Sequence, residues 1–140
     1  YLYSWRSFYM LMMKRFLMIL VMVSWCSVGI AKEITLKKCF NTYVYDKFDK
    51  DEFEKFYFKI DTVKKSMTNV QIYTKPARDR INKDLKDRGE SYRVEPIRIY
   101  ESKIIYIDDN YVKTENDHTT YKVDLKKRIV YSDKLPYQCK

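Results

Sequence analysis

The stretch Phe53–Ile60 reads FEKFYFKI, and its alternating pattern decides the fold class. Phe56, Phe58 and Ile60 fall on one face of an extended chain, and the lysines and the tyrosine between them fall on the other. Alternation with period two and a high aromatic content is typical of a strand that is buried on one face. After a polar interruption, residues 67–74 resume the alternation, so the sequence predicts a β-hairpin.

The last third of the chain continues with short segments of the same kind, such as KIIYI at 103–107 and TTYKVDL at 119–125, separated by polar turns. The sequence therefore predicts a mainly β fold, an antiparallel meander that forms a curved sheet or a small open barrel. The side chains expected in its core are Phe56, Phe58, Ile60, Val70, Ile72, Ile97, Ile99, Ile105, Ile107, Tyr121, Val123, Leu125, Ile129 and Tyr131, with Ile81 and Leu85 added from a helix.

Two of the predicted strands end in the same way. Phe58–Asp61 and Tyr121–Asp124 each finish on an aspartate that is followed at once by a basic turn. An aspartate suits such a corner because its carboxylate accepts backbone N–H groups of the turn. We expect two hairpin corners with the same chemistry, not a duplicated domain.

Residues 76–88 break the β pattern and predict one amphipathic helix. Apolar side chains recur at helical spacing, Pro76 suits the first turn, and Gly89 suits the position just past the end. The helix is expected to lie across the sheet on Ile81 and Leu85. Beyond it, Pro96 shifts the alternation within residues 92–100, which indicates an edge strand or a bulge.

The N-terminal part of the chain predicts export. Lys14 and Arg15 precede an apolar run that ends in Gly29-Ile30-Ala31, which is the layout of a secretory signal peptide over residues 13–31. The rival interpretation is an N-terminal membrane anchor, although residues 16–31 are fewer than the roughly 20 that a spanning helix needs. Because Met13 is a well-placed start, residues 1–12 are a possible untranslated upstream segment.

Cleavage after Ala31 would leave a single β-rich domain over residues 32–140, periplasmic or secreted, with no stable membrane span. Loss of the three basic residues before position 32 leaves 25 against 19 acidic ones, so the net charge falls from +9 to +6. Two cysteines remain, Cys39 and Cys139, near opposite ends of this domain. In an exported protein they are expected to form a disulfide, and their spacing does not fit a redox or zinc motif.

Residues with catalytic chemistry are few. His118 is the single histidine and lies in a predicted turn, and the carboxylates Asp108, Asp109 and Asp117 also lie in turns. The acidic residues of 46–52 lack the glycine and the ligand register of a calcium loop. The sequence therefore predicts no catalytic residue, no metal site and no cofactor.

Basic side chains gather around the predicted helix, where intermixed acids lower the local charge. Intermixed charge on an exposed helix usually serves solubility and i,i+4 pairing. The alternative is a face that binds anionic polymers or lipid headgroups, and nucleic acid is not expected outside the cytoplasm. The residues of this possible anionic-partner face are Arg78, Arg80, Lys83, Lys86, Arg88, Arg93 and Arg98.

Lysine, isoleucine, tyrosine and asparagine are abundant, and arginine is sparser than lysine. With the signal peptide, this composition and layout resembles small exported proteins of AT-rich Gram-negative bacteria of the marine Pelagibacter type. The resemblance includes no motif that assigns a functional residue.

Two functions are compatible with these observations. The first is a non-catalytic envelope protein that binds a protein, glycan or amphiphile through a concave surface edged by tyrosines and basic side chains. The second is a small carboxylate-dependent hydrolase of the cell envelope that uses Asp108, Asp109 or Asp117, with His118. A tyrosine-rimmed hollow without buried acids would favour the first, and two buried carboxylates in a cleft would favour the second.

Overall fold

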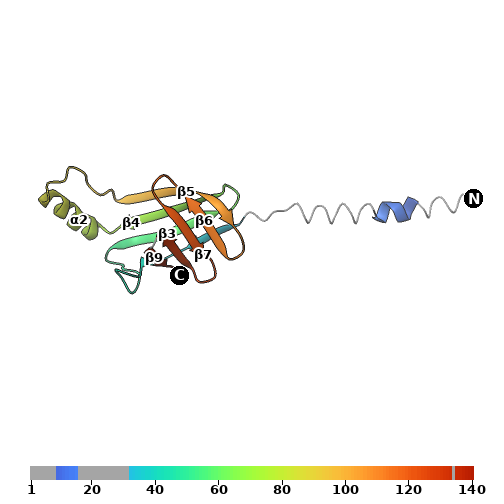
Figure 1. The fold of residues 1–140 in the computed structure, drawn as a ribbon, viewed down its shortest axis with the longest axis horizontal. Coiled ribbons are helices and arrows are strands. Elements are labelled where there is room, and N and C mark those ends of the chain that lie inside the picture. The colour runs from blue at the N-terminus through green and yellow to red at the C-terminus, as the bar shows by residue number, and fades with distance from the viewer. Residues whose placement is uncertain (1–8, 16–31, 134) are drawn as a thin grey trace, which may run out of the picture. The chain divides into compact units, whose positions relative to one another are not determined.

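The structure is a computed structural model that describes residues 9–15, 32–133 and 135–140 (Figure 1). The chain divides into two units, Tyr1–Ala31 and Lys32–Lys140. Residues 9–15 are helical, whereas most of the predicted signal peptide, residues 16–31, lies outside the described residues together with residues 1–8. Among the residues that are described, no helix combines the length and the apolar character needed to cross a membrane.

The second unit is one antiparallel sheet with the strand order β1-β3-β4-β5-β6-β7-β8-β9-β2. Neighbours in sequence are neighbours in the sheet from β3 to β9, as expected for a meander. The strands are β1 (Glu33–Leu36), β2 (Phe40–Asn41), β3 (Phe53–Asp61), β4 (Ser66–Tyr73), β5 (Ile97–Ile107), β6 (Tyr111–Glu115), β7 (Thr120–Asp124), β8 (Ile129–Ser132) and β9 (Leu135–Gln138).

The two ends of the sheet are joined by one short segment, residues 33–41. Its first part pairs as β1 with β3, and its last part pairs as β2 with β9. Between them, Lys37 and Lys140 exchange two backbone hydrogen bonds of 3.0 and 2.7 Å. The sheet is therefore curled upon itself, as Figure 1 shows, and the predicted fold class is confirmed.

The cysteine pair lies at this junction. The Sγ atoms of Cys39 and Cys139 are 2.04 Å apart, and both residues are buried. The pairing expected from the sequence is thus present at disulfide distance.

The core fills the inner face of the curled sheet. Phe56, Phe58 and Ile60 are buried there as predicted, and so is Val123. Phe58 contacts other aromatic rings, with a centroid separation of 5.9 Å to Tyr121. The full set of buried residues in this core is Leu36, Cys39, Phe56, Phe58, Ile60, Met67, Ile104, Val112, Val123, Val130 and Cys139.

The predicted inner face of β5 is wrong. Ile97 and Ile99 are 51% and 61% exposed, and Ile105 and Ile107 are also exposed. The residue that enters the core is Ile104, because β5 presents its even-numbered side chains inward until a bulge at the next position interrupts its register with β6. A one-residue error of register reverses every side chain of a strand.

A similar reversal occurs in β8. Val130 is fully buried, whereas Ile129 and Tyr131, which were expected inside, are half-buried. Among the other predicted core residues, Val70 and Leu85 are buried but lie outside the main core. The predicted inner face of β4 is also reversed, because Val70 pairs with Tyr57 on the outer face while Met67 enters the core. The remaining predicted core residues are half-buried: Ile72, Ile81, Tyr121 and Leu125.

The predicted helix is present as α2, Lys75–Asp87. The hydroxyl of Thr74 accepts a hydrogen bond from the N–H of Ala77, which caps the first turn. At the other end Gly89 has a φ of 77°, and its N–H bonds to Lys86 O while that of Glu90 bonds to Leu85 O. These two bonds form a Schellman motif, in which glycine adopts the left-handed conformation without strain.

The position of α2 differs from the prediction. The helix extends from the end of the sheet where β4 finishes and β5 begins, and it does not lie across the sheet (Figure 1). Leu85 is buried near this junction, but the outward face of β5 stays uncovered. That placement explains why Ile97 and Ile99 are exposed.

Candidate functional site

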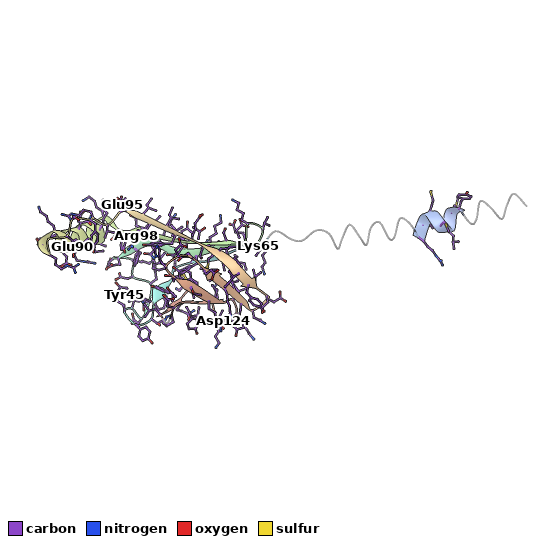
Figure 2. All side chains as sticks on the ribbon, turned by 45° about the horizontal axis from the view of Figure 1, so that its top comes forward. Tyr45, Lys65, Glu90, Glu95, Arg98 and Asp124 are labelled. Atoms are coloured by element: carbon purple, nitrogen blue, oxygen red, sulfur yellow. A yellow bond between two sulfur atoms is a disulfide. The ribbon has the colours of Figure 1, made fainter. Side chains whose placement is uncertain are left out.

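A groove of about 570 Å³ lies where α2, the segment after it and the first half of β5 meet. It combines apolar side chains with three tyrosines and two arginines. The lining residues are Tyr73, Ile81, Leu85, Tyr92, Arg93, Val94, Glu95, Ile97, Arg98, Ile99 and Tyr100. Figure 2 shows Arg98 and Glu95 at the end of the sheet that carries α2, whereas Asp124 lies toward the other end.

The segment between α2 and β5 is held in place by side-chain hydrogen bonds to its backbone. The Oδ1 atom of Asn82 accepts from Val94 N at 2.7 Å, and its Nδ2 atom donates to Val94 O at 3.4 Å. Arg93 donates to the carbonyls of Glu90 and Tyr92 at 2.7 and 2.8 Å. The Asn82 bonds fasten the segment to α2, and the Arg93 bonds hold the segment internally, so this wall of the groove is preformed.

The first half of β5 forms another wall and has a neighbour on only one side. Residues 97–103 pair with β4, but pairing with β6 begins at Lys103. None of the strands that the structure describes pairs with residues 97–102 on the side away from β4. The expectation of an edge strand around Pro96 is met here, and the bulge lies farther along, between Ile104 and Tyr106.

Arg98 is the half-buried cation of the groove. Its Nη1 atom donates to the hydroxyl of Tyr73 at 3.4 Å, and its guanidinium carbon lies 5.3 Å from the ring centre of Tyr100. Burial alone would lower the pKa of Arg98, but side-chain hydrogen bonding to Tyr73 and electrostatic interaction with Tyr100 favour the charged form, and the net direction is upward. Among the described residues no carboxylate pairs with this guanidinium.

Tyrosines edge the groove and continue into the curled sheet. Tyr73 stacks on Phe53 with ring centres 4.8 Å apart, and Tyr92 and Tyr100 are exposed. Deeper inside, burial raises the pKa of Tyr121, and burial likewise raises that of Tyr137. Both phenols are therefore neutral over the physiological range and act as hydrogen-bonding, largely apolar surface.

The basic residues of the possible anionic-partner face differ in their partners. Two cations of α2 and the residue after it make i,i+4 ion pairs, at 2.7 Å for Lys75–Asp79 and Lys83–Asp87 and at 3.0 Å for Arg88–Asp84. Arg80 pairs with Glu52 at 2.8 Å. Arg78 and Lys86 have no ion pair within the described part of the chain, and Arg93 and Arg98 lie in the groove. The face stays a prediction.

The carboxylates of the hydrolase hypothesis lie in two separate turns. Asp108 is in the β5–β6 turn, where it accepts from the N–H groups of Asn110 and Tyr111 and from the Tyr106 hydroxyl at 2.6 Å. Asp109 is exposed in the same turn. Asp117 and His118 are exposed in the β6–β7 turn at the opposite end of β6, a strand of five residues, so about 16 Å separates the two turns.

Two other aspartates serve the hairpin corners as predicted. Asp61 accepts from Val63 and Lys64 N–H groups at 3.0 Å, and Asp124 accepts from Lys127 N at 2.9 Å. Asp124 is the buried carboxylate of the described residues, at 7% exposure. In that same part of the chain, no three histidine, cysteine or acidic side chains are placed to hold a metal ion.

Sequence reasoning found Arg93 and Arg98 but not the groove. The groove joins Tyr73 to Arg98, residues 25 positions apart, and it depends on where α2 leaves the sheet. The available signal was Pro96, which marked the edge strand. Comparison of the chain with known protein families, with curated proteins and with solved structures finds no match.

Proposed function

We propose that this protein is an exported, non-catalytic binding module of the cell envelope, and that the groove between α2 and β5 is its binding surface. The observation that carries the proposal is Arg98, a half-buried cation that contacts two tyrosines in the groove. A cation placed in this way is available to an anionic group of a ligand.

The other side chains of the groove suit a binding role. Exposed Ile97, Ile99 and Tyr92 supply apolar area that water covers in the free protein, and burial of such area favours association. Tyrosine adds a hydroxyl at a small cost in side-chain entropy. The partner is expected to be an envelope component, a protein, glycan or amphiphile, and not a nucleic acid.

Export is supported by the cysteine pair and by the charged and apolar layout of residues 13–31. A buried cysteine pair at disulfide distance suits an oxidising compartment. In a Gram-negative host that expresses the gene from Met13, mass spectrometry is expected to find Lys32 or a near neighbour as the first residue. Recovery of the uncleaved chain from the membrane fraction would favour the anchor instead.

The hydrolase remains the second candidate, with less support. Glycosidase-type chemistry needs two carboxyl groups roughly 5–10 Å apart across a cleft. Asp108 is occupied by its own turn, and the groove contributes one acid, Glu95. A binding role requires none of these carboxylates.

The experiment is capture from envelope extract with three forms of the tagged chain. Tyr100→Ala removes an exposed side chain of the groove, and Lys126→Ala is a matched control in the β7–β8 turn. The proposal expects a partner that is retained by the wild type and by Lys126→Ala but lost with Tyr100→Ala. Equal capture by all three forms would place the binding surface elsewhere.

A further inference from the structure

The free side of β5 carries unpaired backbone groups in a regular order. In an antiparallel pair, alternate residues direct both N–H and C=O toward the partner strand. Tyr73 N bonds to Pro96 O, and Ile104 N bonds to Lys65 O, so the even-numbered residues of β5 face β4. It follows that Ile97, Ile99 and Glu101 direct their N–H and C=O groups away from β4.

This open edge ends where β6 begins. The side chain of Asn116 donates to Glu101 O at 3.4 Å, so the residues left with free backbone groups are Ile97 and Ile99 together with Glu101 N–H. β6 pairs with the second half of β5, in line with the open part of the edge. In Figure 1 the first half of β5 has β4 on one side and no strand on the other. A strand added beside the first half of β5 would lie in line with β6, on the same side of β5.

The two faces of this edge differ in chemistry. Ile97 and Ile99 point to the uncovered outer side, where they are more than half exposed. Arg98 and Tyr100 point to the inner side, and among the described residues Arg98 contacts two tyrosines and has no ion pair. A strand beside β5 would thus meet apolar side chains on one face and a positive charge on the other.

We propose that the open edge of β5 binds an extended segment of another protein as an added antiparallel strand, with an acidic side chain beside Arg98 and apolar side chains over Ile97 and Ile99. The proposal rests on the proposed binding function and gives its ligand a chemical class. Main-chain hydrogen bonds supply affinity in this mode of recognition, and the alternating side chains supply specificity.

Charge argues against a second copy of this chain as the occupant. Symmetric pairing about Ile99 sets Arg98 beside Tyr100 of the other copy, with no acid against either arginine. Pairing about Arg98 sets the two arginines side by side. Residues 32–140 also carry a net charge of +6, which opposes self-association and favours an acidic segment.

The test uses the synthetic peptide acetyl-Ser-Val-Glu-Val-Glu-Val-Ser-amide and the ¹⁵N-labelled full chain. In the free protein the amides of Ile97 and Ile99 are expected to exchange with solvent much faster than those of Arg98 and Tyr100, which bond to β4. At saturating peptide, exchange at Ile97 and Ile99 is expected to slow at least tenfold. Binding that leaves their exchange unchanged would overturn strand addition.

Matched peptides and protein variants separate the contribution of the main-chain hydrogen bonds from that of the Arg98 charge. N-methylation of the valines blocks the N–H groups that face β5 and is expected to abolish binding, whereas N-methylation of the glutamates leaves it intact. Replacement of both glutamates by lysine, and the protein variant Arg98→Gln, are each expected to weaken binding about tenfold, the order of one charge-assisted hydrogen bond. Ile99→Lys, an edge-blocking change, is a second variant that keeps the β4 pairing.

Three results would contradict the inference. Equal affinity for the two N-methylated peptides would show that β5 makes no ladder with the ligand. Concentration-dependent protection of Ile97 and Ile99 without peptide would identify a second copy as the occupant. Groove-dependent capture from envelope extract, combined with no binding of the glutamate peptide, would leave the proposed function standing and overturn the acidic strand alone.

Discussion

Removal of the cysteine pair is expected to destabilise the domain strongly and to leave the fold intact. The bond joins residues 100 positions apart, so it closes a loop that contains β2 to β9. In the chain-entropy model a loop of roughly 100 residues stabilises the folded state by about 4.7 kcal/mol. A domain of this size has a total stability of about 5–15 kcal/mol. The Cys39→Ala/Cys139→Ala variant should therefore lose roughly 30% or more of its free energy of unfolding.

The structure indicates why the variant should still fold. The reciprocal backbone bonds between Lys37 and Lys140 do not depend on the cysteines. Arg128 adds a guanidinium bond of 3.3 Å to Thr35 O and a second bond to Lys140 O. These contacts keep the ends of the sheet together, so the lost stability comes mainly from a less restricted unfolded chain.

Urea unfolding of the oxidised wild type and the double variant measures this difference. Each single variant should lose about as much as the double variant, because either change removes the same bond. Wild-type protein unfolded in the presence of a reductant should match the double variant. A loss below about 1 kcal/mol, with the bond shown by non-reducing peptide mapping in the wild type, would refute the entropic account.

Three further predictions concern single side chains. Phe58→Ala should lower the free energy of unfolding by about 3–5 kcal/mol, because the ring is fully buried among aromatic residues. Tyr57→Ala, on the opposite face, should lower it much less. Equal losses in urea unfolding would contradict the assigned faces. Gly89→Ala should cost about 1–2 kcal/mol because of the φ of 77° alone, since nothing lies within 4 Å of an added Cβ, and an unchanged melting temperature would contradict this. The Tyr106 hydroxyl and two backbone N–H groups lower the pKa of Asp108, and the pKa of Tyr106 is raised in return. The contribution of Asp108 to stability is therefore present above pH 3.8, and it is lost as the pH falls through the lower pKa that this carboxyl has in the folded state. Tyr106→Phe should move the carboxyl pKa of Asp108 upward in a ¹³C NMR titration, and an unmoved pKa would exclude the hydrogen bond.

The local features of the fold were predictable because neighbouring residues determine them. Phe53–Ile60 could be assigned as a strand from its alternation, and Gly89 marked the end of α2 correctly. Asp61 and Asp124 could be placed at hairpin corners because their bonds stay within the turn. Each of these signals spans only a few residues.

The errors lie where distant residues decide. In β5 the adjacent isoleucines 104 and 105 suit either face, and only pairing with β4 and β6 selects Ile104 for the core. The position of α2 likewise depends on where β4 ends and on the bonds between Asn82 and Val94. The groove depends both on the inward face of β5 and on the position of α2. Residues of the groove could therefore be named individually from the sequence, but the sequence did not show that they lie together.

Unequal strand lengths connect the fold to the proposed binding surface. β3, β4 and β5 have nine, eight and eleven residues, whereas β6 to β9 have five or four. Where a short strand follows a long one in a meander, part of the long strand has no partner on that side, and here that part is the first half of β5. The closure of the sheet by Cys39, Cys139 and residues 33–41 involves other strands. Loss of the disulfide should therefore lower stability while the exchange pattern at Ile97 and Ile99 stays the same, and a binding defect in the folded double variant would show that the two regions are coupled.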